Sequence, residues 1–123
     1  LGFRQQEKTH LMENAVYNEL CARGYSVDVG NVEVNTVDEK GTKVRRMLEV
    51  DFVCNRGYKR CYIQSALSLP DREKMQQESA SLLRIDDSFM KYVITGDRIK
   101  KYQNDDGIVI MNVLDFLLDE QSV

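Results

Sequence analysis

The spacing of apolar residues along the chain predicts an α/β domain. From about Glu7 to Arg23, apolar residues recur at intervals of three and four, which is the period of an amphipathic helix. Gly24 follows as the expected stop of this helix. The stretch 25–37 (YSVDVGNVEVNTV) then alternates apolar and polar positions and is rich in valine, so it predicts a β-strand.

Two further strands are expected after short turns. The turn DEKG precedes a strand at 42–54 (TKVRRMLEVDFVC), and the turn NRGYK precedes a strand at 60–69 (RCYIQSALSL). A second helix is predicted from near Pro70 through REKMQQESASLL, because proline and acidic residues are favoured in a first helical turn. KYVIT and GIVIMNV read as two buried strands, and LDFLLD predicts a short final helix.

The predicted order is therefore helix, three-strand meander, helix, two strands and helix (αβββαββα). The strand after the second helix is expected to cross over and run parallel to an earlier strand, which makes the central sheet mixed and flanked by helices. A length of 123 residues suits one domain with one core.

Composition changes this picture only in part. The net charge of −3 and the absence of a basic excess count against DNA binding by the whole surface, but they leave room for a local basic patch. No stretch approaches the ~18 apolar residues of a membrane span, so we expect a soluble, cytoplasmic protein without membrane contact. The chain begins LGFRQQEK without an initiator methionine, and we expect it to be a domain of a longer protein.

The three cysteines carry little chemistry. Their number is odd and their spacing is not that of a zinc site, so neither a disulfide framework nor a metal centre is predicted. We expect Cys21, Cys54 and Cys61 to be small buried apolar residues.

Polar residues interrupt the two strands on either side of the NRGYK turn. If Cys54 faces Cys61 across this turn, the same register places Asp51 opposite Gln64. One face would then carry Glu49, Asp51, Tyr62, Gln64 and Ala66, and the other would carry Val50, Phe52, Cys54, Cys61 and Ile63. The second set reads as core. We expect the first helix to cover the polar set through Glu13, because buried polar groups need partners.

This polar set resembles part of a metal-dependent nuclease site. Mg²⁺ binds carboxylate oxygens and retained waters, and a nuclease adds a lysine near the attacking water. Glu13 and Asp51 would supply two carboxylates. Gln64 offers only a neutral oxygen and Ala66 offers none, so the set is one anion and one cation short.

Longer segments carry a family resemblance. ENAVYNELCARGYSVDVG, LEVDFVCNRGYKRCYIQSALSLPDREK, SLLRIDDSFMKYVIT and DGIVIMNVLDFLLD together resemble the C-terminal domain found behind the ATPase module in a family of bacterial and archaeal AAA+ proteins. That domain is similar to the restriction-endonuclease-like, PD-(D/E)xK nuclease superfamily. The resemblance covers nearly the whole chain and implies one such domain over residues 1–123. It also implies that ATP binds in an N-terminal AAA+ module of the same polypeptide, and this sequence has no glycine-rich phosphate loop.

The resemblance also implies roles for single residues. Glu13 matches the superfamily's first-helix glutamate, Asp51 matches its metal-binding aspartate, and Gln64 falls at its E-x-K motif. Glu13 and Asp51 are thus the expected metal ligands, and Glu13, Asp51 and Gln64 the expected catalytic set of a degenerate site. A lysine or arginine from elsewhere could replace the missing lysine, and the sequence leaves open Lys59, Arg60, Arg72 and Lys74.

Each of these residues also has a structural explanation. Glu13 fits a solvated or capping acid of a helix, and Gln64 fits a hydrogen-bonded core partner of Asp51. Basic residues gather on the strand at 42–54 and its following turn, namely Lys43, Arg45, Arg46, Arg56, Lys59 and Arg60. Arg45, Arg46, Lys59 and Arg60 are predicted to contact nucleic-acid phosphates, and the alternative is that they protect a strand edge.

The sequence therefore favours an accessory domain with a degenerate nuclease fold that binds nucleic acid or protein without catalysis. An active Mg²⁺-dependent deoxyribonuclease that uses Glu13, Asp51 and Gln64 is the first alternative. A structural domain that makes the ATPase oligomerise is the second.

Overall fold

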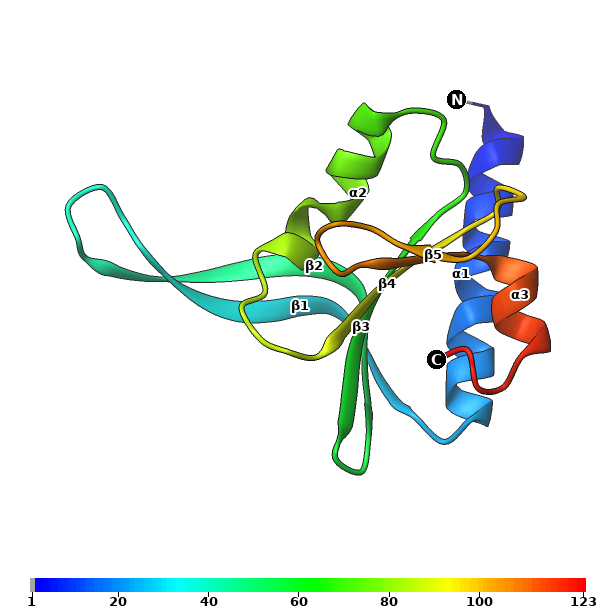
Figure 1. Cartoon of the computed structure of the whole chain (residues 1–123), viewed down its shortest axis with the longest axis horizontal. Helices are drawn as coiled ribbons and strands as arrows, with labels where there is room; N and C mark the ends of the chain where they lie inside the picture. Colours follow the sequence, from blue (N-terminus) through cyan, green and yellow to red (C-terminus); the bar gives the residue numbers. More distant parts are fainter. Residues whose placement is uncertain (1) are drawn as a thin grey trace.

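A mixed β-sheet organises the computed structural model, which describes residues 2–123 (Figure 1). The strands are β1 (Ser26–Val37), β2 (Lys43–Arg56), β3 (Lys59–Ala66), β4 (Met90–Thr95), β5 (Tyr102–Gln103) and β6 (Val109–Asn112). The helices are α1 (Phe3–Ala22), α2 (Arg72–Leu83) and α3 (Val113–Leu118). The six strands of this described part lie in the order β1-β2-β3-β4-β6-β5.

Most of the predicted order is confirmed. The strands β1, β2 and β3 form an antiparallel meander, and β4 crosses over through α2 to run parallel to β3. β6 runs parallel to β4. The prediction of two strands between α2 and the last helix is wrong, because the two-residue β5 also pairs with β6, antiparallel to it. Two residues are too few for an alternating pattern to reveal a strand.

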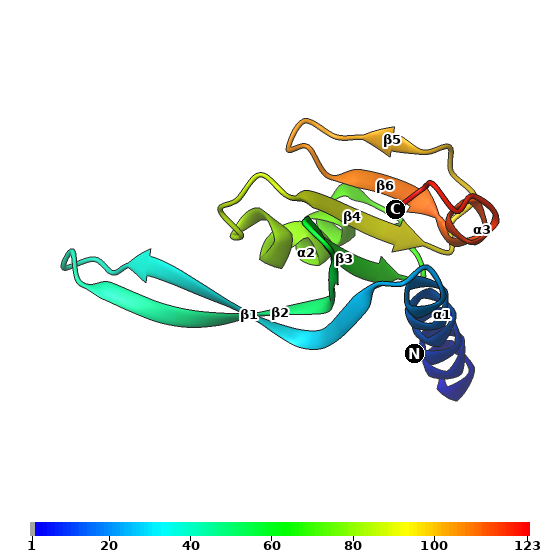
Figure 2. The same ribbon diagram turned by 90° about the horizontal axis from the view of Figure 1, so that it is seen from below.

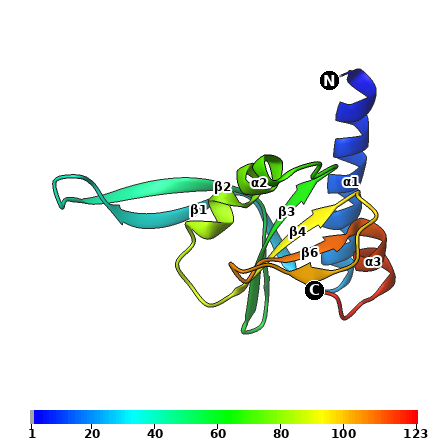
Figure 3. The same ribbon diagram turned by 45° about the horizontal axis from the view of Figure 1, so that its top comes forward.

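The helices cover both faces of the sheet. α1 and α3 lie side by side on one face, where Val16, Leu20 and Phe116 pack with Phe52 and Ile63 (Figures 1 and 3). α2 covers the other face, where the buried cluster contains Val50, Val53, Tyr62, Leu82, Val93 and Ile110. Within residues 2–123, no helix combines the length and the apolar character needed to cross a membrane.

The predicted cysteine register is confirmed, and the predicted burial of the cysteines is confirmed in part. Cys54 pairs with Cys61 across the β2–β3 turn, and both side chains are buried with free thiols. Cys21, near the end of α1, is exposed. It lies on the solvent side of a helix whose buried residues are Met12, Val16 and Leu20.

A β-bulge in β2 corrects the predicted faces. Val29 of β1 pairs with Phe52, but the next residue, Gly30, pairs with Val50, so Asp51 has no partner in β1. One extra residue inverts the alternation of side chains along the strand. Val50 therefore packs under α2, and not with Phe52 under α1 as the unbroken pattern predicts. Glu49 likewise does not share the face of Gln64.

Beyond the bulge, β1 and β2 continue without further strands beside them. β3 pairs with β2 only from Phe52 to Arg56, so residues 31–49 form a two-stranded arm that projects from the body (Figures 1 and 2). Val32 and Leu48 bury the base of the arm against the α2 face. Farther out, Thr36 and Arg46 border a cavity that Arg84, at the end of α2, also lines.

The N-terminal cap of α2 gives a test of the fold. The Asp71 carboxylate caps α2 by accepting a hydrogen bond from the Lys74 backbone N–H at 2.8 Å. We expect Asp71→Ala to lower the free energy of unfolding in urea by about 1 kcal/mol, because it removes this acceptor. Asp71→Asn keeps an oxygen there and should retain most of the stability. Equal losses in the two variants would contradict the capping role.

Candidate functional site

Asp51 lies at the bulge, where β2, β3 and both long helices meet. Its Oδ2 accepts a hydrogen bond from the Ser65 backbone N–H at 2.8 Å and another from the Ser65 hydroxyl at 3.2 Å. Two other acids lie close to it. The charge of Asp51 acts on Glu13 of α1, and the charge of Glu78 of α2 acts on Asp51. The bulge turns this carboxylate toward the junction of the two helices.

Gln64 joins the same junction to α2. Its Oε1 accepts a hydrogen bond from the Asp51 backbone N–H at 2.7 Å, and its Nε2 donates one to the Glu78 backbone carbonyl at 3.2 Å. The Gln64 amide oxygen thus replaces the β1 acceptor that the Asp51 N–H lacks at the bulge. The expectation that the first helix covers this side chain is wrong, because Gln64 lies against α2. Both polar atoms of Gln64 are engaged in backbone contacts.

The carboxylates gather beside a small cavity on the α1 side. Glu13, Glu49 and Asp51 border a cavity of about 260 Å³ together with the residues of the bulge. Burial raises the pKa of the Glu13 carboxyl, the charge of Asp51 raises it further, and His10 lowers it. Glu13 therefore lies near Asp51, as the sequence predicts for these two residues.

The same environment disfavours the ionised form of Asp51. Burial raises its pKa, the two hydrogen bonds from Ser65 lower it, and the charges of Glu78 and Glu49 raise it again, so that the pKa lies above its ordinary value. Two carboxylates could offer oxygens to Mg²⁺. Among residues 2–123, however, no group of three or more His, Cys, Asp or Glu side chains could hold a metal ion. With the Gln64 oxygen already engaged, these residues do not fit a preformed metal centre.

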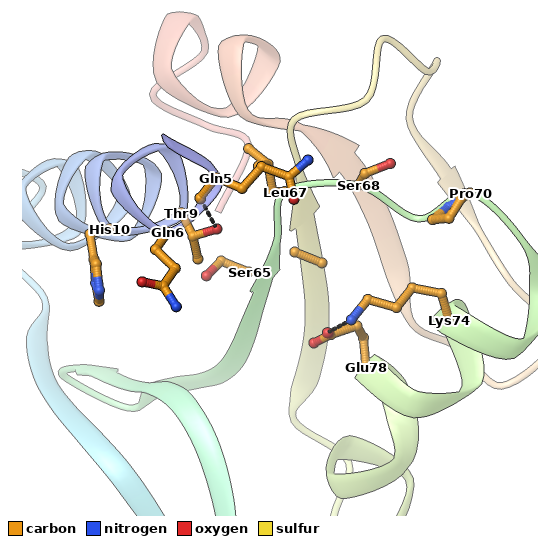
Figure 4. A pocket seen from close by; sticks show the side chains of 11 residues that line it. Gln5, Gln6, Thr9, His10, Ser65, Leu67, Ser68, Pro70, Lys74 and Glu78 are labelled. Carbon is orange, nitrogen blue, oxygen red and sulfur yellow. Dashed lines mark hydrogen bonds and ion pairs between the residues drawn. The ribbon is translucent and has the colours of Figure 1, made fainter. Parts of the chain in front are cut away.

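A larger cavity of about 650 Å³ opens between α1 and α2, beside the C-terminal end of β3 (Figure 4). Its polar lining comprises Gln5, Gln6, Thr9, His10, Ser65, Ser68, Lys74 and Glu78. Ser65 connects the two cavities, because it lines the larger one and donates two hydrogen bonds to Asp51. The site is therefore a polar junction between two helices and the end of a strand.

Of the four basic side chains that the sequence left open, Lys74 is the one that lines the larger cavity. Its Nζ lies 3.0 Å from Glu78 Oε1, and both side chains line the larger cavity (Figure 4). Lys59 instead lies over the Tyr25 ring and Arg60 over the Tyr62 ring. Arg72 is exposed and does not line this cavity.

Glu78 is the acid that sequence reasoning missed. It lies on α2, next to the position of Asp51, and it forms an (i, i+4) pair with Lys74. That spacing of lysine and glutamate on a predicted helix was a visible signal. Nothing in the sequence indicates that this helix face points toward β2.

The four residues predicted to contact phosphates do not form one surface. Arg45 and Arg46 are consecutive, so they point to opposite faces of the arm. Arg45 is ion-paired with Glu33, whereas Arg46 lines a groove on the α2 side. Lys59 and Arg60 also diverge, since they lie over rings in different apolar clusters.

Comparison with known proteins gives little functional information. No protein-family model matches the chain. The chain is 34% identical over 118 residues to an uncharacterized protein of Haemophilus influenzae, a match that covers 96% of this chain and 25% of that protein. The chain thus spans about a quarter of the length of the curated relative that it matches.

The link made by Gln64 predicts a stability cost that is specific to its position. Gln64→Leu should lower the free energy of unfolding by about 1–3 kcal/mol, because it leaves the Asp51 N–H and the Glu78 carbonyl without partners. Gln76→Leu, on the exposed surface of α2, is the matched control and should change stability by less than about 0.5 kcal/mol. Similar costs for both variants in urea titrations would contradict this structural role.

The raised pKa of Asp51 predicts a pH-dependent effect of Asp51→Asn. A carboxyl whose pKa is raised by folding contributes stability below its unfolded pKa, and this contribution is lost as the pH rises through the folded pKa. Between about pH 4 and pH 7, the variant should therefore gain stability relative to the wild type. Thermal unfolding across this range measures the difference, with Asp105→Asn on an exposed turn as the control. A difference that stays constant with pH would contradict the prediction.

Proposed function

We propose that this domain binds nucleic acid without catalysis, with a restriction-endonuclease-like fold whose metal site has become a structural link. The observation that carries this proposal is the use of both Gln64 polar atoms on backbone groups of β2 and α2. At the motif position where the superfamily has an acid, this chain has Gln64, which links β2 to α2 through hydrogen bonds. Ala66, two residues on, is buried and contributes packing only.

The arrangement of elements supports the proposed fold. A helix precedes a three-strand meander, a second helix leads to a strand parallel to β3, and Glu13 and Asp51 come together between α1 and β2. These are the features that the resemblance implies for this fold. The proposal does not depend on a bound metal ion.

The larger cavity supports nucleic acid as the partner. Phosphate groups are commonly bound by lysine and by the hydroxyl and amide groups of serine, threonine and glutamine, which together form much of this lining. Lys74 is the lysine among them, held toward the cavity by Glu78. A local site of this kind is compatible with a net charge of −3 for the whole chain.

We further propose that the domain is the C-terminal accessory part of an AAA+ ATPase. The matched relative is about four times as long as the match, which leaves room for such a module in that protein. ATP would then bind in the N-terminal module of the same polypeptide. This part of the proposal is tested by expressing the full-length protein and measuring ATP hydrolysis.

Fluorescence anisotropy with labelled oligonucleotides tests nucleic-acid binding directly. We expect the domain to bind at low salt with a Kd of roughly 1–100 μM, and the affinity to fall as salt rises. Lys74→Glu should weaken binding, whereas Asp51→Asn should leave it within about twofold. Binding that is absent at low salt, with a stable dimer in sedimentation, would replace this proposal with a structural role in oligomerisation.

One observation favours an active nuclease as the second candidate. Lys74 and Glu78 bring a lysine and an acid to the edge of the site, although both come from α2 and not from β3. If these residues replace the missing motif, plasmid cleavage in millimolar Mg²⁺ or Mn²⁺ should be abolished by Asp51→Asn and by Lys74→Ala. Our proposal predicts that the wild-type domain leaves the plasmid intact.

A further inference from the structure

The α2-facing side of the arm borders a groove that the proposed function does not yet include. Two adjoining cavities of about 410 and 300 Å³ share Val34 of the arm and Arg84 at the end of α2. One wall is the arm, and the other is the segment 84–89 that follows α2. The arm and this segment extend toward the same side of the molecule (Figure 2).

Three arginines from separate elements line this groove. Arg46 comes from the arm, Arg84 from the end of α2 and Arg60 from β3. Within residues 2–123, none of the three takes part in an ion pair. In that same part of the chain, the Arg60 Nε is buried and has no hydrogen-bond partner. A guanidinium carries several further N–H donors, so each of the three arginines can offer donors to anionic oxygens at the groove.

The acids of the groove are mostly occupied. Asp87 accepts a hydrogen bond from the Tyr62 hydroxyl at 2.6 Å and is paired with Lys91 at 3.2 Å. Glu33 is paired with Arg45, on the other face of the arm. Asp86 is the acid left to oppose the three arginines, so the groove is locally positive although the chain as a whole is negative.

The groove also presents an aromatic ring. Phe89 lines it and is 41% exposed, whereas the Tyr62 ring is 2% exposed and lies beneath the Arg60 guanidinium. An exposed ring beside a row of cations is the combination that binds single-stranded nucleic acids, because bases stack on the ring while phosphates meet the cations. A duplex keeps its bases stacked on each other and cannot offer one to Phe89.

The geometry points to a single-stranded nucleic acid as the ligand of this groove. The phosphates contact Arg46, Arg84 and Arg60, and a base stacks on Phe89. This inference rests on the proposed nucleic-acid function and assigns it a strand type and a second surface besides the Lys74 cavity. Arginine guanidinium groups suit this role, since their planar donors match phosphate oxygens in pairs.

Anisotropy with a labelled 12-nucleotide DNA, the same sequence as RNA and the DNA duplex tests the inference. We expect both single strands to bind more tightly than the duplex, and the ratio of DNA to RNA affinity shows which is preferred. Arg46→Glu and Arg84→Glu should each weaken single-strand binding by about fivefold or more. Phe89→Leu should weaken it by a similar factor, and Asp86→Asn should strengthen it.

Lys43→Glu is the matched control. It makes the same change of charge on the same strand, but Lys43 points to the opposite face of the arm from Arg46. We expect it to change the affinity by less than about twofold. Circular dichroism and thermal unfolding establish that each variant is folded before its affinity is compared.

The outcomes separate this inference from the proposed function. A wild-type domain that binds no oligonucleotide at low salt would overturn both. Binding that is weakened by Lys74→Glu but unaffected by Arg46→Glu and Arg84→Glu would overturn the groove and leave the proposed function standing. Tighter binding of the duplex, or equal effects of Lys43→Glu and Arg46→Glu, would also overturn the groove.

Discussion

Asp51 occupies a bulge at which two residues of β2 oppose Gly30 of β1, and the two surfaces that we propose to bind nucleic acid follow from the resulting change of strand direction. Before the bulge, the arm directs Arg46 and Leu48 toward the α2 side of the sheet. After it, Phe52 faces α1 and the meander continues into β3. Bulges of this kind re-aim side chains and increase local twist. The same residue thus separates the arm from the body and lies within the polar junction.

The bulge leaves a polar gap that neighbouring side chains fill. Asp51 loses its partner in β1, and the Gln64 amide accepts from its N–H. The other end of Gln64 holds the Glu78 carbonyl, and Ser65 satisfies the Asp51 carboxylate. In a buried setting, such a network is stable only when its members are satisfied. Each contact therefore gives a polar side chain of the junction a structural partner.

The sequence predicted the elements well and the faces less well. Periodicity located α1, the meander and α2, and the Cys54–Cys61 register is as expected. The sheet faces predicted for Val50 and Glu49 were wrong, because an alternating pattern of apolar and polar residues does not reveal a single extra residue in a strand. Gly30 was the available hint, because a glycine inside a strand often marks a bulge. The structure shows why a glycine lies there, since its φ of +111° is a conformation that favours glycine.

Only those residues of the candidate site whose positions follow from strand register could be predicted from the sequence. Asp51 and Gln64 follow from the register, whereas Glu78 comes from a helix whose docking depends on tertiary packing. The groove beside the arm could not be predicted from the sequence either. Arg46, Arg60 and Arg84 are far apart along the chain, and the arginine next to Arg46 points the opposite way.

The central claim is that the Asp51 junction is a structural link and not a metal site. Calorimetric titration of the domain with Mg²⁺ and Mn²⁺, beside the Asp51→Asn variant, tests it most directly. Our account predicts no saturable heat up to millimolar metal in either protein. Saturable binding by the wild type that Asp51→Asn removes would contradict it and would restore the junction as a metal site.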